Sequence, residues 1–528
     1  MKRLSKLFSK ENSIRGASIL LIITLTLSNI LGLLRDRFLT KNIPTFDLDI
    51  YYASFRIPDL VFNFLVLGAI TSAFIPVFSD YLSKKEDGEA WRVTNLLVNI
   101  AFVFTLISGI ALYFLMPMAI KMVVPSFDET RFNEVVKYSR ILMLTPVFFS
   151  LSYILGGVLN CYKRFFAYSL APLIYNASII VGAFLAPTFG LKGVVYCVVG
   201  GSMLHALVQL PAAIRLGFKY KPVLDFKDKA IRRIIILMLP RTISMGAGQI
   251  MLLVFTAIAS SLKSGSITAF NLANNIQTVP TVILGTSFAT AVFPTLAQTI
   301  SRGDMAKFSF YLNRALRSIA FLLIPSTVIF ILLRAQIVRL ILGSGKFGWD
   351  DTKLTAMTLG FFALSLIAQG IIPLLSRAFY ALKNTKTPMY ISIVTVLISV
   401  GLAFIFSKRF EAYPVAGLAL AFSIGNFINA GLLLLLLKQS YSRVLAKDLI
   451  LGLVKTILLS LVMAIIVWSV MHLMANVVDM NRFSGIFIQT LVSAGSGVLA
   501  YILLNYIFDS DELKWAISRN INGETKSD

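Results

Sequence analysis

Long apolar runs make up most of the chain and are separated by short polar segments. A helix needs about 20 mostly apolar residues to cross a bilayer, and fourteen runs come close to this length or exceed it. The pattern predicts an all-α polytopic membrane protein with about fourteen transmembrane helices, at residues 17–39, 50–79, 93–118, 136–160, 168–187, 190–214, 234–262, 266–299, 312–341, 353–381, 387–407, 414–437, 449–474 and 484–508.

Composition agrees with this prediction. The 528 residues are 57% hydrophobic and 14% charged, whereas a soluble domain has about 25% charged residues. The formal net charge of +24 is spread over short loops. A nucleic-acid-binding domain would gather that charge on one soluble surface, so we expect no nucleic acid among the partners.

Cysteine and histidine are too rare to build a cofactor or metal site. Cys161 and Cys197 support neither a disulfide framework nor a metal-ligand spacing. His205 and His472 lie far apart in the sequence. We therefore predict no metal and no cofactor, and expect each histidine to be a helix residue with a local hydrogen-bond partner.

Loop charges predict the orientation in the membrane. With the N-terminus inside, the inner segments carry 29 of the 49 Lys and Arg residues and the outer segments carry 16. Cytoplasmic loops carry the excess of basic residues, so both termini are predicted to be cytoplasmic. The most basic segment, 215–233, holds seven basic and two acidic residues and is predicted to be a cytoplasmic loop beside anionic lipid headgroups.

The two halves of the chain resemble each other. Residues 71–76 match 289–294, and the basic turn at Lys163 matches the turn at Lys383, in the same order and with a spacing near 220 residues. Repeats with a site near the midplane between them are the usual build of secondary transporters. The predicted domains are an N-lobe at 1–215, a cytoplasmic linker at 216–233, a C-lobe at 234–437, and a C-terminal helix pair with its tail at 438–528.

A glycine-rich stretch at 343–348, GSGKFG, matches a phosphate-loop pattern. It follows no predicted strand and opens no βα unit, so its context argues against nucleotide binding. We predict an outer turn between the ninth and tenth spans. No ATP-binding domain is recognisable in the chain, so ATP hydrolysis by this polypeptide is not expected to drive its function.

Arginines interrupt three of the apolar runs. Arg35 ends the first run beside Asp36, Arg56 has apolar and aromatic neighbours, and Arg241 follows Pro240 before a long uncharged run. A charge near the bilayer centre costs roughly 2.5–3.5 kcal/mol or more unless it meets a partner or water. The guanidinium group is suited to bidentate phosphate contact. The three arginines therefore predict a site inside the bilayer for an anionic substrate.

Acidic residues nearby leave two interpretations open. Asp36 and Asp49 could hold the arginines while the cavity is empty, with substrate competing for the same donors. The alternative is purely structural ion pairing with Asp36, Asp49 or Asp59.

Amide side chains add uncharged polar groups to the same spans. They either tie helices together by hydrogen bonds or bind sugar and peptide groups of a substrate. The candidates for substrate contact are Asn29, Asn63 and Asn275.

Several stretches together resemble the MurJ (MviN) family of lipid II flippases, within the multidrug/oligosaccharidyl-lipid/polysaccharide exporter superfamily. The most specific stretch is FYALKNTKTP at 379–388. The resemblance covers most of 17–437 and is carried by residues 32–36, 55–60, 68–69, 73–76, 159–160, 164–165, 171–172, 209–211, 345–347, 377–388, 417–421 and 429–430.

This resemblance implies two six-helix lobes around a central cavity, with two C-terminal helices forming a groove for a lipid tail. It implies transport of the undecaprenyl-pyrophosphate-linked peptidoglycan precursor across the bacterial cytoplasmic membrane by alternating access. Arg35 and Asp36 match the family's cavity pattern, and Arg56 matches a basic position of the second span. The expected partners are the lipid-linked glycan, the bilayer and other cell-wall synthesis proteins. The sequence leaves open whether transport is coupled to an ion or to the membrane potential, and it identifies no ion.

The sequence also departs from the family. Asn29 and Asn275 stand at positions of family arginines, Phe62 or Asn63 stands at another, and Leu67 replaces an acid. The run at 391–406 has no evident counterpart of the residues linked to sodium in the family.

We expect a transporter that makes and breaks no covalent bond, and a lipid II flippase in particular. One alternative is an exporter of another lipid-linked glycan, of O-antigen or teichoic type, which the neutral residues at arginine positions favour. Another is a membrane scaffold that recruits wall-synthesis enzymes; the persistence of Arg35, Arg56 and Arg241 argues against it.

Overall fold

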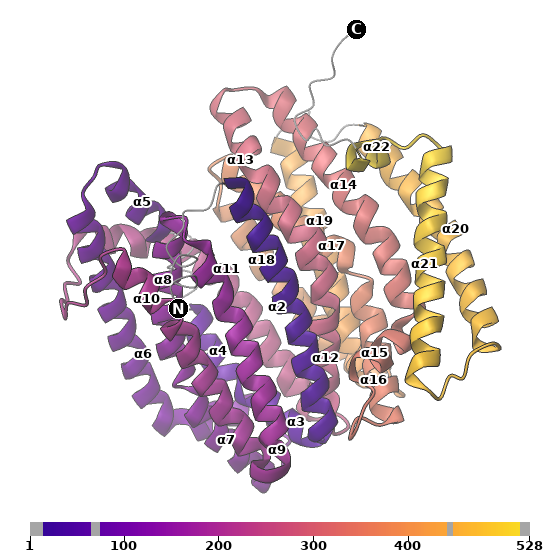
Figure 1. Cartoon of the computed structure of the whole chain (residues 1–528), viewed down its shortest axis with the longest axis horizontal. Coiled ribbons are helices and arrows are strands. Elements are labelled where there is room, and N and C mark those ends of the chain that lie inside the picture. Colours follow the sequence, from indigo (N-terminus) through magenta and orange to yellow (C-terminus); the bar gives the residue numbers. More distant parts are fainter. Residues whose placement is uncertain (1–13, 65–73, 441–446, 518–528) are drawn as a thin grey trace, which may run out of the picture. The chain divides into compact units, whose positions relative to one another are not determined.

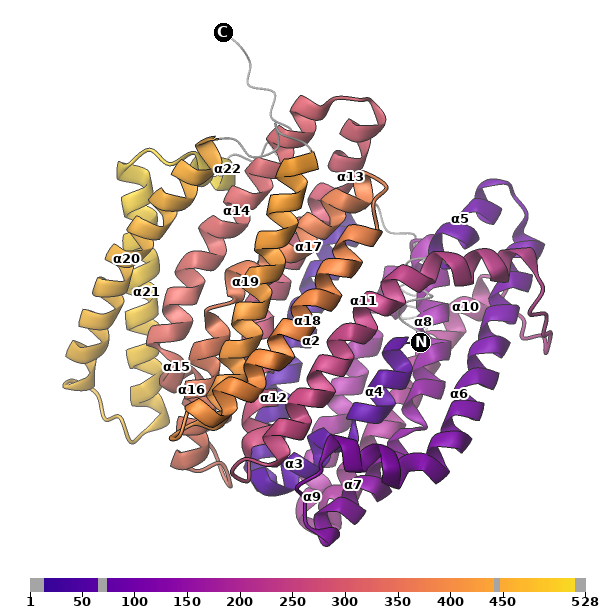
Figure 2. The same cartoon turned by 180° about the vertical axis from the view of Figure 1, so that it is seen from behind.

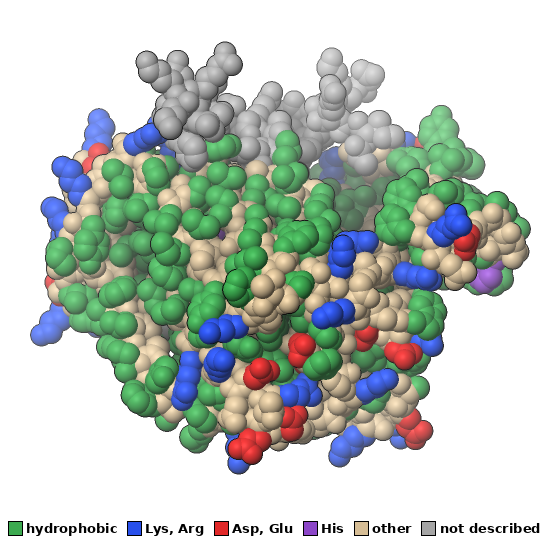
Figure 3. All heavy atoms as spheres, turned by 60° about the horizontal axis from the view of Figure 1, so that its bottom comes forward, with side chains coloured by type: hydrophobic (Ala, Val, Ile, Leu, Met, Phe, Trp, Pro, Cys, Tyr) green, Lys and Arg blue, Asp and Glu red, His purple; other side chains and the backbone are tan. Residues whose placement is uncertain are grey.

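The computed structural model describes residues 14–64, 74–440 and 447–517, without the side chains of 14–22, 240–241, 440, 447–448 and 516–517. All regular secondary structure in these residues is helical, which confirms the predicted all-α fold (Figure 1). The hydrocarbon of a bilayer offers no water to backbone groups, and a helix satisfies its own. Hydrophobic side chains cover much of the surface, and charged ones gather in the lower half of the view in Figure 3.

Two compact units divide the chain. The first comprises residues 1–271 and 344–348, and the second comprises 272–343 and 349–528. The helices of the first unit are α2 (Ile14–Asn42), α3 (Thr45–Ser54), α4 (Arg56–Phe62), α5 (Ile75–Ser83), α6 (Asp87–Val123), α7 (Glu129–Leu142), α8 (Thr145–Cys161), α9 (Phe165–Leu207), α10 (Leu210–Arg215), α11 (Lys229–Ser260) and the start of α12 (Ser266–Pro280).

The second unit begins within α12. It continues with η3 (Thr281–Thr286), α13 (Ser287–Ser301), α14 (Met305–Leu332), α15 (Arg334–Leu342), α16 (Trp349–Ala363), α17 (Leu366–Ala381), α18 (Lys386–Arg409), α19 (Pro414–Ser440), α20 (Lys447–Ala475), α21 (Phe483–Ile507) and α22 (Asp511–Ile517). Figure 2 shows α18 and α19 side by side, and these two helices pack closely together.

The predicted linker at 216–233 is held against the first unit. Asn95 on α6 donates to Lys219 O at 3.0 Å and accepts from Lys221 N at 2.8 Å. Asn99, one turn later, donates to Val223 O at 2.9 Å. Helix α11, which follows the linker, packs against α4 and α6. The boundary between the two compact units therefore falls after residue 271 in the sequence and not in the linker. The division into lobes stays a prediction.

Ten helices of the described residues are long and apolar enough to cross a membrane, or eleven if α16 and α17, bent by 44°, form one span. The predicted span 50–79 includes residues 65–73, which lie outside the described residues. In the predicted span 17–39, the side chains of 17–22 are not described. The predicted spans 168–187 and 190–214 share the single helix α9.

Helix α9 is nevertheless two spans. Gly190 interrupts it with φ 63° and ψ −162°, a left-handed conformation that glycine adopts without cost. The two legs lie against each other, since Ser178 Oγ donates to Cys197 O at 2.8 Å. The small residue Gly182 lets the legs approach, because an added Cβ would meet the Cys197 side chain. The turn between the predicted fifth and sixth spans therefore lies at Gly190.

The internal repeat is visible in the helix ends. Lys163 after α8 and Lys383 after α17 have φ 56° and 60°. In each turn the next amide donates to the carbonyl five residues earlier, at 2.8 and 2.9 Å, as in a Schellman helix end. Lys85 and Gly303, after α5 and α13, make the same turn with φ 60° and 72° and bonds of 3.0 Å. Matching turns occur in both halves with the predicted spacing.

Each unit has its own apolar core. In the first, Phe74, Phe78 and Leu96 are fully buried in a cluster that joins α5, α6, α8 and α11. In the second, a cluster of α13, α14, α17 and α19 is centred on buried residues such as Phe308 and Leu374. These cores fix the helices on which the polar residues described below are placed.

Candidate substrate site

Arg35 and Asp36 on α2 form an ion pair inside the first unit. Arg35 donates to Asp36 Oδ1 through Nε at 3.0 Å and Nη2 at 2.8 Å. Its Nη1 donates to Asn176 Oδ1 on α9 at 3.2 Å. The Asp36 side chain is 1% exposed and that of Arg35 is 22% exposed. Three of the five guanidinium N–H donors are thus engaged, and the other two make no hydrogen bond within the described residues.

Asn176 is held in place to receive Arg35. Its Nδ2 donates to Pro172 O, one turn earlier on α9, at 3.1 Å. Pro172 has no backbone N–H and therefore donates no hydrogen bond within the helix. Its carbonyl oxygen accepts the hydrogen bond from the side-chain amide of Asn176. The guanidinium of Arg35 is therefore oriented by one carboxylate on its own helix and one amide on a neighbouring helix.

Arg56 begins α4 and is 9% exposed. Its Nε donates to Thr256 Oγ1 on α11 at 2.7 Å, and its Nη2 donates to Asn271 Oδ1 on α12 at 2.6 Å. Within the described residues it makes no ion pair, and Asp59 on the next turn interacts with it only over a longer distance. Arg56 therefore remains a cation held by neutral acceptors.

Tyr52 on α3 lies near both arginines. It is close enough to interact electrostatically with Arg35, Asp36 and Arg56. Its hydroxyl oxygen is buried and has no hydrogen-bond partner among the described residues. A buried hydroxyl without a hydrogen-bond partner destabilises the protein. A ligand oxygen near Arg35 would accept a hydrogen bond from this hydroxyl and would be stabilised by it.

Asp49 differs from the prediction that it holds one of the three arginines. Its Oδ2 accepts from Gly265 N at 2.6 Å, and its Oδ1 accepts from Thr268 N at 2.8 Å and Thr268 Oγ1 at 2.7 Å. The first amides of a helix lack partners within it, and Asp49 supplies acceptors for the first turn of α12. Its cationic neighbour is Arg131 on α7, at 3.5 Å.

The other predicted residues are dispersed. Asn29 is half-buried on α2, and Asn63 donates to Asp59 O of its own helix at 2.8 Å. Asn275 lies on the part of α12 that belongs to the second unit. The side chain of Arg241, on α11, lies outside the described part of the structure, as does Leu67. The structure thus joins Arg35 and Asp36 directly, and Tyr52 is close enough to interact electrostatically with this pair and with Arg56.

In the second unit, amides form a separate buried cluster. Gln277 on α12 and Gln369 on α17 bond to each other, with Gln369 Nε2 donating at 2.7 Å. Gln277 also donates to Asn274 Oδ1 at 3.0 Å. After Pro280 the chain turns into the π-helix η3, a feature that is frequent at functional sites. This cluster shows the helix-tying role of amides.

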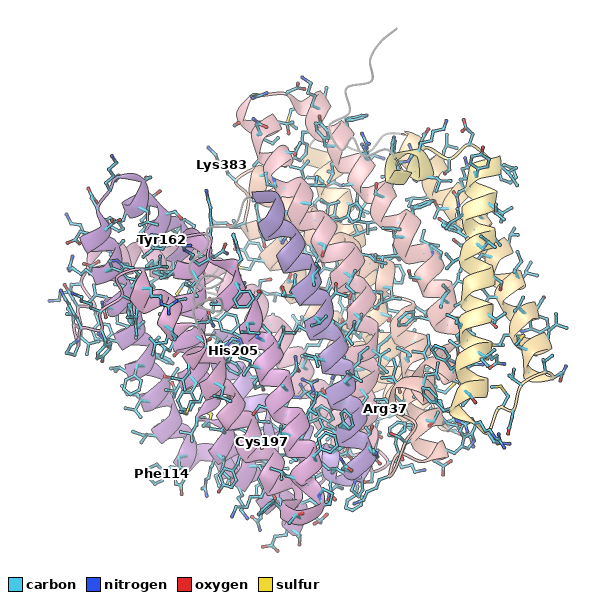
Figure 4. All side chains as sticks on the ribbon, in the orientation of Figure 1. Arg37, Phe114, Tyr162, Cys197, His205 and Lys383 are labelled. Atoms are coloured by element: carbon cyan, nitrogen blue, oxygen red, sulfur yellow. The ribbon has the colours of Figure 1, made fainter. Side chains whose placement is uncertain are left out.

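The two histidines and the glycine-rich turn behave as predicted. His205 Nδ1 lies 2.6 Å from Ser152 Oγ, inside the first unit (Figure 4), and His472 Nδ1 lies 2.8 Å from Trp468 O, which confirms a local partner for each histidine. The turn 343–348 opens no strand, and Lys346 N donates to Lys41 O at 3.1 Å. No group of three metal-ligating side chains occurs among the described residues.

Sequence reasoning missed the neutral partners of the arginines. Asn176, Thr256 and Asn271 are uncharged polar residues that lie 141, 200 and 215 residues away from the arginines they bind. Tyr52 looked like one more aromatic neighbour of Arg56.

Comparison with known proteins agrees with this architecture. The family model described as "Lipid II flippase MurJ" matches residues 45–488. A "Probable lipid II flippase MurJ" from Rhizobium tropici is 28% identical over 413 residues, which cover 76% of this chain and 77% of that protein.

Two solved structures have the same fold. A structure described as "Lipid II flippase MurJ, inward closed conformation" has a TM-score of 0.77 and 28% identity, covering 93% of this chain and 98% of its own. An inward-facing MATE family transporter of the MOP superfamily has a TM-score of 0.66 over 80% of this chain and 98% of its own; at 16% identity it shows the fold alone. The predicted resemblance is confirmed, and because the family model matches most of the sequence, this chain belongs to the lipid II flippase MurJ family.

Proposed function

We propose that this protein is a flippase that moves lipid II, the undecaprenyl-pyrophosphate-linked peptidoglycan precursor, across the bacterial cytoplasmic membrane. The proposal rests on membership of the MurJ family, on the multi-pass helical fold, and on one observation in the site. The Arg35 guanidinium keeps two donors without a hydrogen bond, and Tyr52, whose hydroxyl has no partner among the described residues, is close enough to interact electrostatically with Arg35. The protein would act as a transporter and not as an enzyme.

The pyrophosphate would bind by exchange of partners. Asp36 neutralises Arg35 in the empty site, which removes much of the cost of a buried cation. A pyrophosphate oxygen offers the same kind of acceptor as a carboxylate and forms charge-assisted hydrogen bonds with guanidinium groups. Arg56, which makes no ion pair in the described residues, adds positive charge behind Tyr52. Substrate would therefore be attracted without a fully uncompensated charge in the empty protein.

Transport would follow from unequal binding in two conformations. A ligand shifts a conformational equilibrium only as far as it binds one state better. Arg35 and Arg56 are each tied to neighbouring helices, through Asn176 and through Thr256 and Asn271. When substrate draws the guanidinium groups toward its phosphates, these interhelical bonds weaken and a different packing becomes accessible.

The long polyprenyl tail would remain in contact with lipid along the C-terminal helix pair. Helix α20 packs against α14 and α21 against α15. Large apolar side chains on their outer faces, such as Leu458, Ile465 and Leu491, are 57%, 66% and 60% exposed. Both termini in the cytoplasm, contacts with other wall-synthesis proteins, and coupling to an ion or the membrane potential stay predictions.

The decisive experiment is flipping of fluorescent lipid II by the purified protein in vesicles. Arg35→Ala should abolish most transport. Arg35→Lys should impair transport, because the lysine ammonium group lacks the planar, paired N–H donors of a guanidinium. Arg37→Ala is a matched control two residues further along α2, about 200° around the helix from Arg35, and it should retain activity. Normal transport by both Arg35→Ala and Arg56→Ala would show that the arginines are structural.

Export of another lipid-linked glycan is the second candidate. It is favoured by Asn29 and Asn275, which are neutral residues at positions where the MurJ family has arginines. The same vesicles loaded with an undecaprenyl-linked O-antigen or teichoic precursor separate the two functions. Faster transport of that glycan than of lipid II would favour the alternative.

A further inference from the structure

Two cavities of the second unit share a wall formed by Arg314 on α14 and Trp515 on α22. One cavity, of about 190 Å³, has mostly apolar walls that include Phe288, Val292 and Phe321. The other, of about 280 Å³, has a more polar lining, with Ser309, Asn313 and Arg317 beside Arg314 and Trp515. Arg314 therefore borders both a mostly apolar cavity and a cavity whose lining mixes polar and apolar groups, an arrangement that suits an amphiphile with an anionic head.

The charges around Trp515 are divided unequally. Arg314 and Arg317 each place the guanidinium carbon 4.8 Å from the centre of the Trp515 ring. Arg317 is neutralised, with Nε 2.6 Å from Glu512 Oε1 and Nη2 3.1 Å from Asp511 Oδ2. Both nearby carboxylates are thus engaged by Arg317, and Arg314 has no acidic partner among the described residues. Arg314 is the cation available to a ligand.

The position in the chain fits a membrane interface. Helix α14 begins nine residues before Arg314, and α22 follows the end of the span α21, so both lie at one end of the unit (Figures 1 and 2). The sequence predicts that this end is cytoplasmic. Trp and Tyr are enriched at the level of the headgroups, and Tyr311 and Trp515 both line the apolar cavity. Cytoplasmic leaflets carry the anionic lipids that attract basic side chains.

We propose that Arg314 and Trp515 form a binding site for an anionic phospholipid. The phosphate contacts Arg314 on the polar side, and the start of one acyl chain occupies the apolar cavity between α13, α14 and α22. Trp515 separates the two parts and packs against both. The lipid thereby becomes part of the contact between α22 and α14. This site is distinct from the Arg35 site, and its occupation does not depend on the substrate proposed above.

The test uses the full chain in phosphatidylcholine vesicles that contain acyl-brominated lipid, which quenches nearby tryptophan. The emission of Trp515 is obtained as the difference between the protein and its Trp515→Phe variant. Acyl-brominated phosphatidylglycerol should quench this emission with an apparent association about fivefold stronger than acyl-brominated phosphatidylcholine, the preference that ~1 kcal/mol for one basic residue gives. Arg314→Gln should remove the preference.

Arg302→Gln is the matched control, since Arg302 is an exposed arginine in the turn just before α14. This variant should keep the preference for the anionic lipid. Equal quenching by both lipids in the unmodified protein, or an unchanged preference in Arg314→Gln, would overturn the proposal. If inorganic phosphate at the same concentration as the lipid relieved the quenching, Arg314 would be a site for free phosphate and not for a lipid. That result would also overturn the proposal.

Discussion

The Arg56 guanidinium donates to Asn271 Oδ1 over 2.6 Å and so joins α4 to the second turn of α12. The same group reaches α11 through Thr256. Asp49 on α3 caps the first turn of α12 through Gly265 and Thr268. The connection between α11 and α12 is therefore fixed from two sides, by a carboxylate and by a guanidinium.

A double-mutant cycle should detect the Arg56–Asn271 bond. We expect a coupling free energy of about 1.5–3 kcal/mol between Arg56→Ala and Asn271→Ala, the range for hydrogen bonds to charged groups. The free energy of unfolding would be measured by titrating detergent-solubilised protein with sodium dodecyl sulfate. Asn63→Ala is the control partner, because Asn63 bonds to its own helix and its coupling to Arg56 should be near zero. Equal coupling in both cycles would contradict the assignment.

Tyr52→Phe should separate substrate binding from stability. The hydroxyl has no partner in the described residues, so its removal should leave the unfolding free energy unchanged or higher. If it donates to the pyrophosphate, one lost charge-assisted bond should lower lipid II transport about tenfold. Tyr390→Phe, at an exposed tyrosine of α18, should transport normally. Unimpaired transport by Tyr52→Phe would exclude the hydroxyl from the site.

The sequence predicted the parts of the structure that follow from local pattern. Apolar runs located the helices, and the repeated basic turns at Lys163 and Lys383 proved to be matching helix ends. The break at Gly190 lies at the first residue of the predicted span 190–214, next to the predicted gap after residue 187. These features depend on lipid solvation and on backbone conformation, which neighbouring residues determine.

The partners of the charged residues could not be predicted in the same way. Asp49 was expected beside an arginine, but a carboxylate satisfies free backbone amides equally well, and those of Gly265 and Thr268 lie more than 200 residues away. Arg56 found neutral acceptors and no carboxylate. Which polar groups meet inside a bundle depends on how helices distant in the sequence pack, and apolar patterning does not encode this.

The orientation in the membrane can be tested by cysteine labelling from outside the cell. Lys227, in the linker, and Lys346, in the turn after α15, are both exposed in the structure, so burial would block neither label. In a chain with Cys161→Ser and Cys197→Ser, a membrane-impermeant maleimide should label Lys346→Cys and miss Lys227→Cys, since basic loops stay inside. The reverse pattern would invert the topology.

Glu512 should make the attachment of α22 dependent on pH. Burial by itself raises the pKa of Glu512, but the hydrogen bonds from Arg317 and Ser510, at 2.6 and 2.8 Å, outweigh burial and lower this pKa below its ordinary value. The ordinary value is about 4.3. Because the detached state then binds a proton more readily, the stabilisation is fully present above about pH 4.3 and is lost as pH falls through the lowered pKa.

The emission of Trp515, isolated by subtraction of the Trp515→Phe variant, would report this change, since Arg314 and Arg317 lie against its ring only while α22 is docked. We expect a shift in emission as pH falls below about 4. Glu512→Gln should lack this step and show weaker docking near neutral pH, because the amide removes the ionic part of the contact with Arg317. Asp509→Asn, which breaks only the exposed pair with Lys514, should keep the step. An identical pH profile in Glu512→Gln would assign the change to another group.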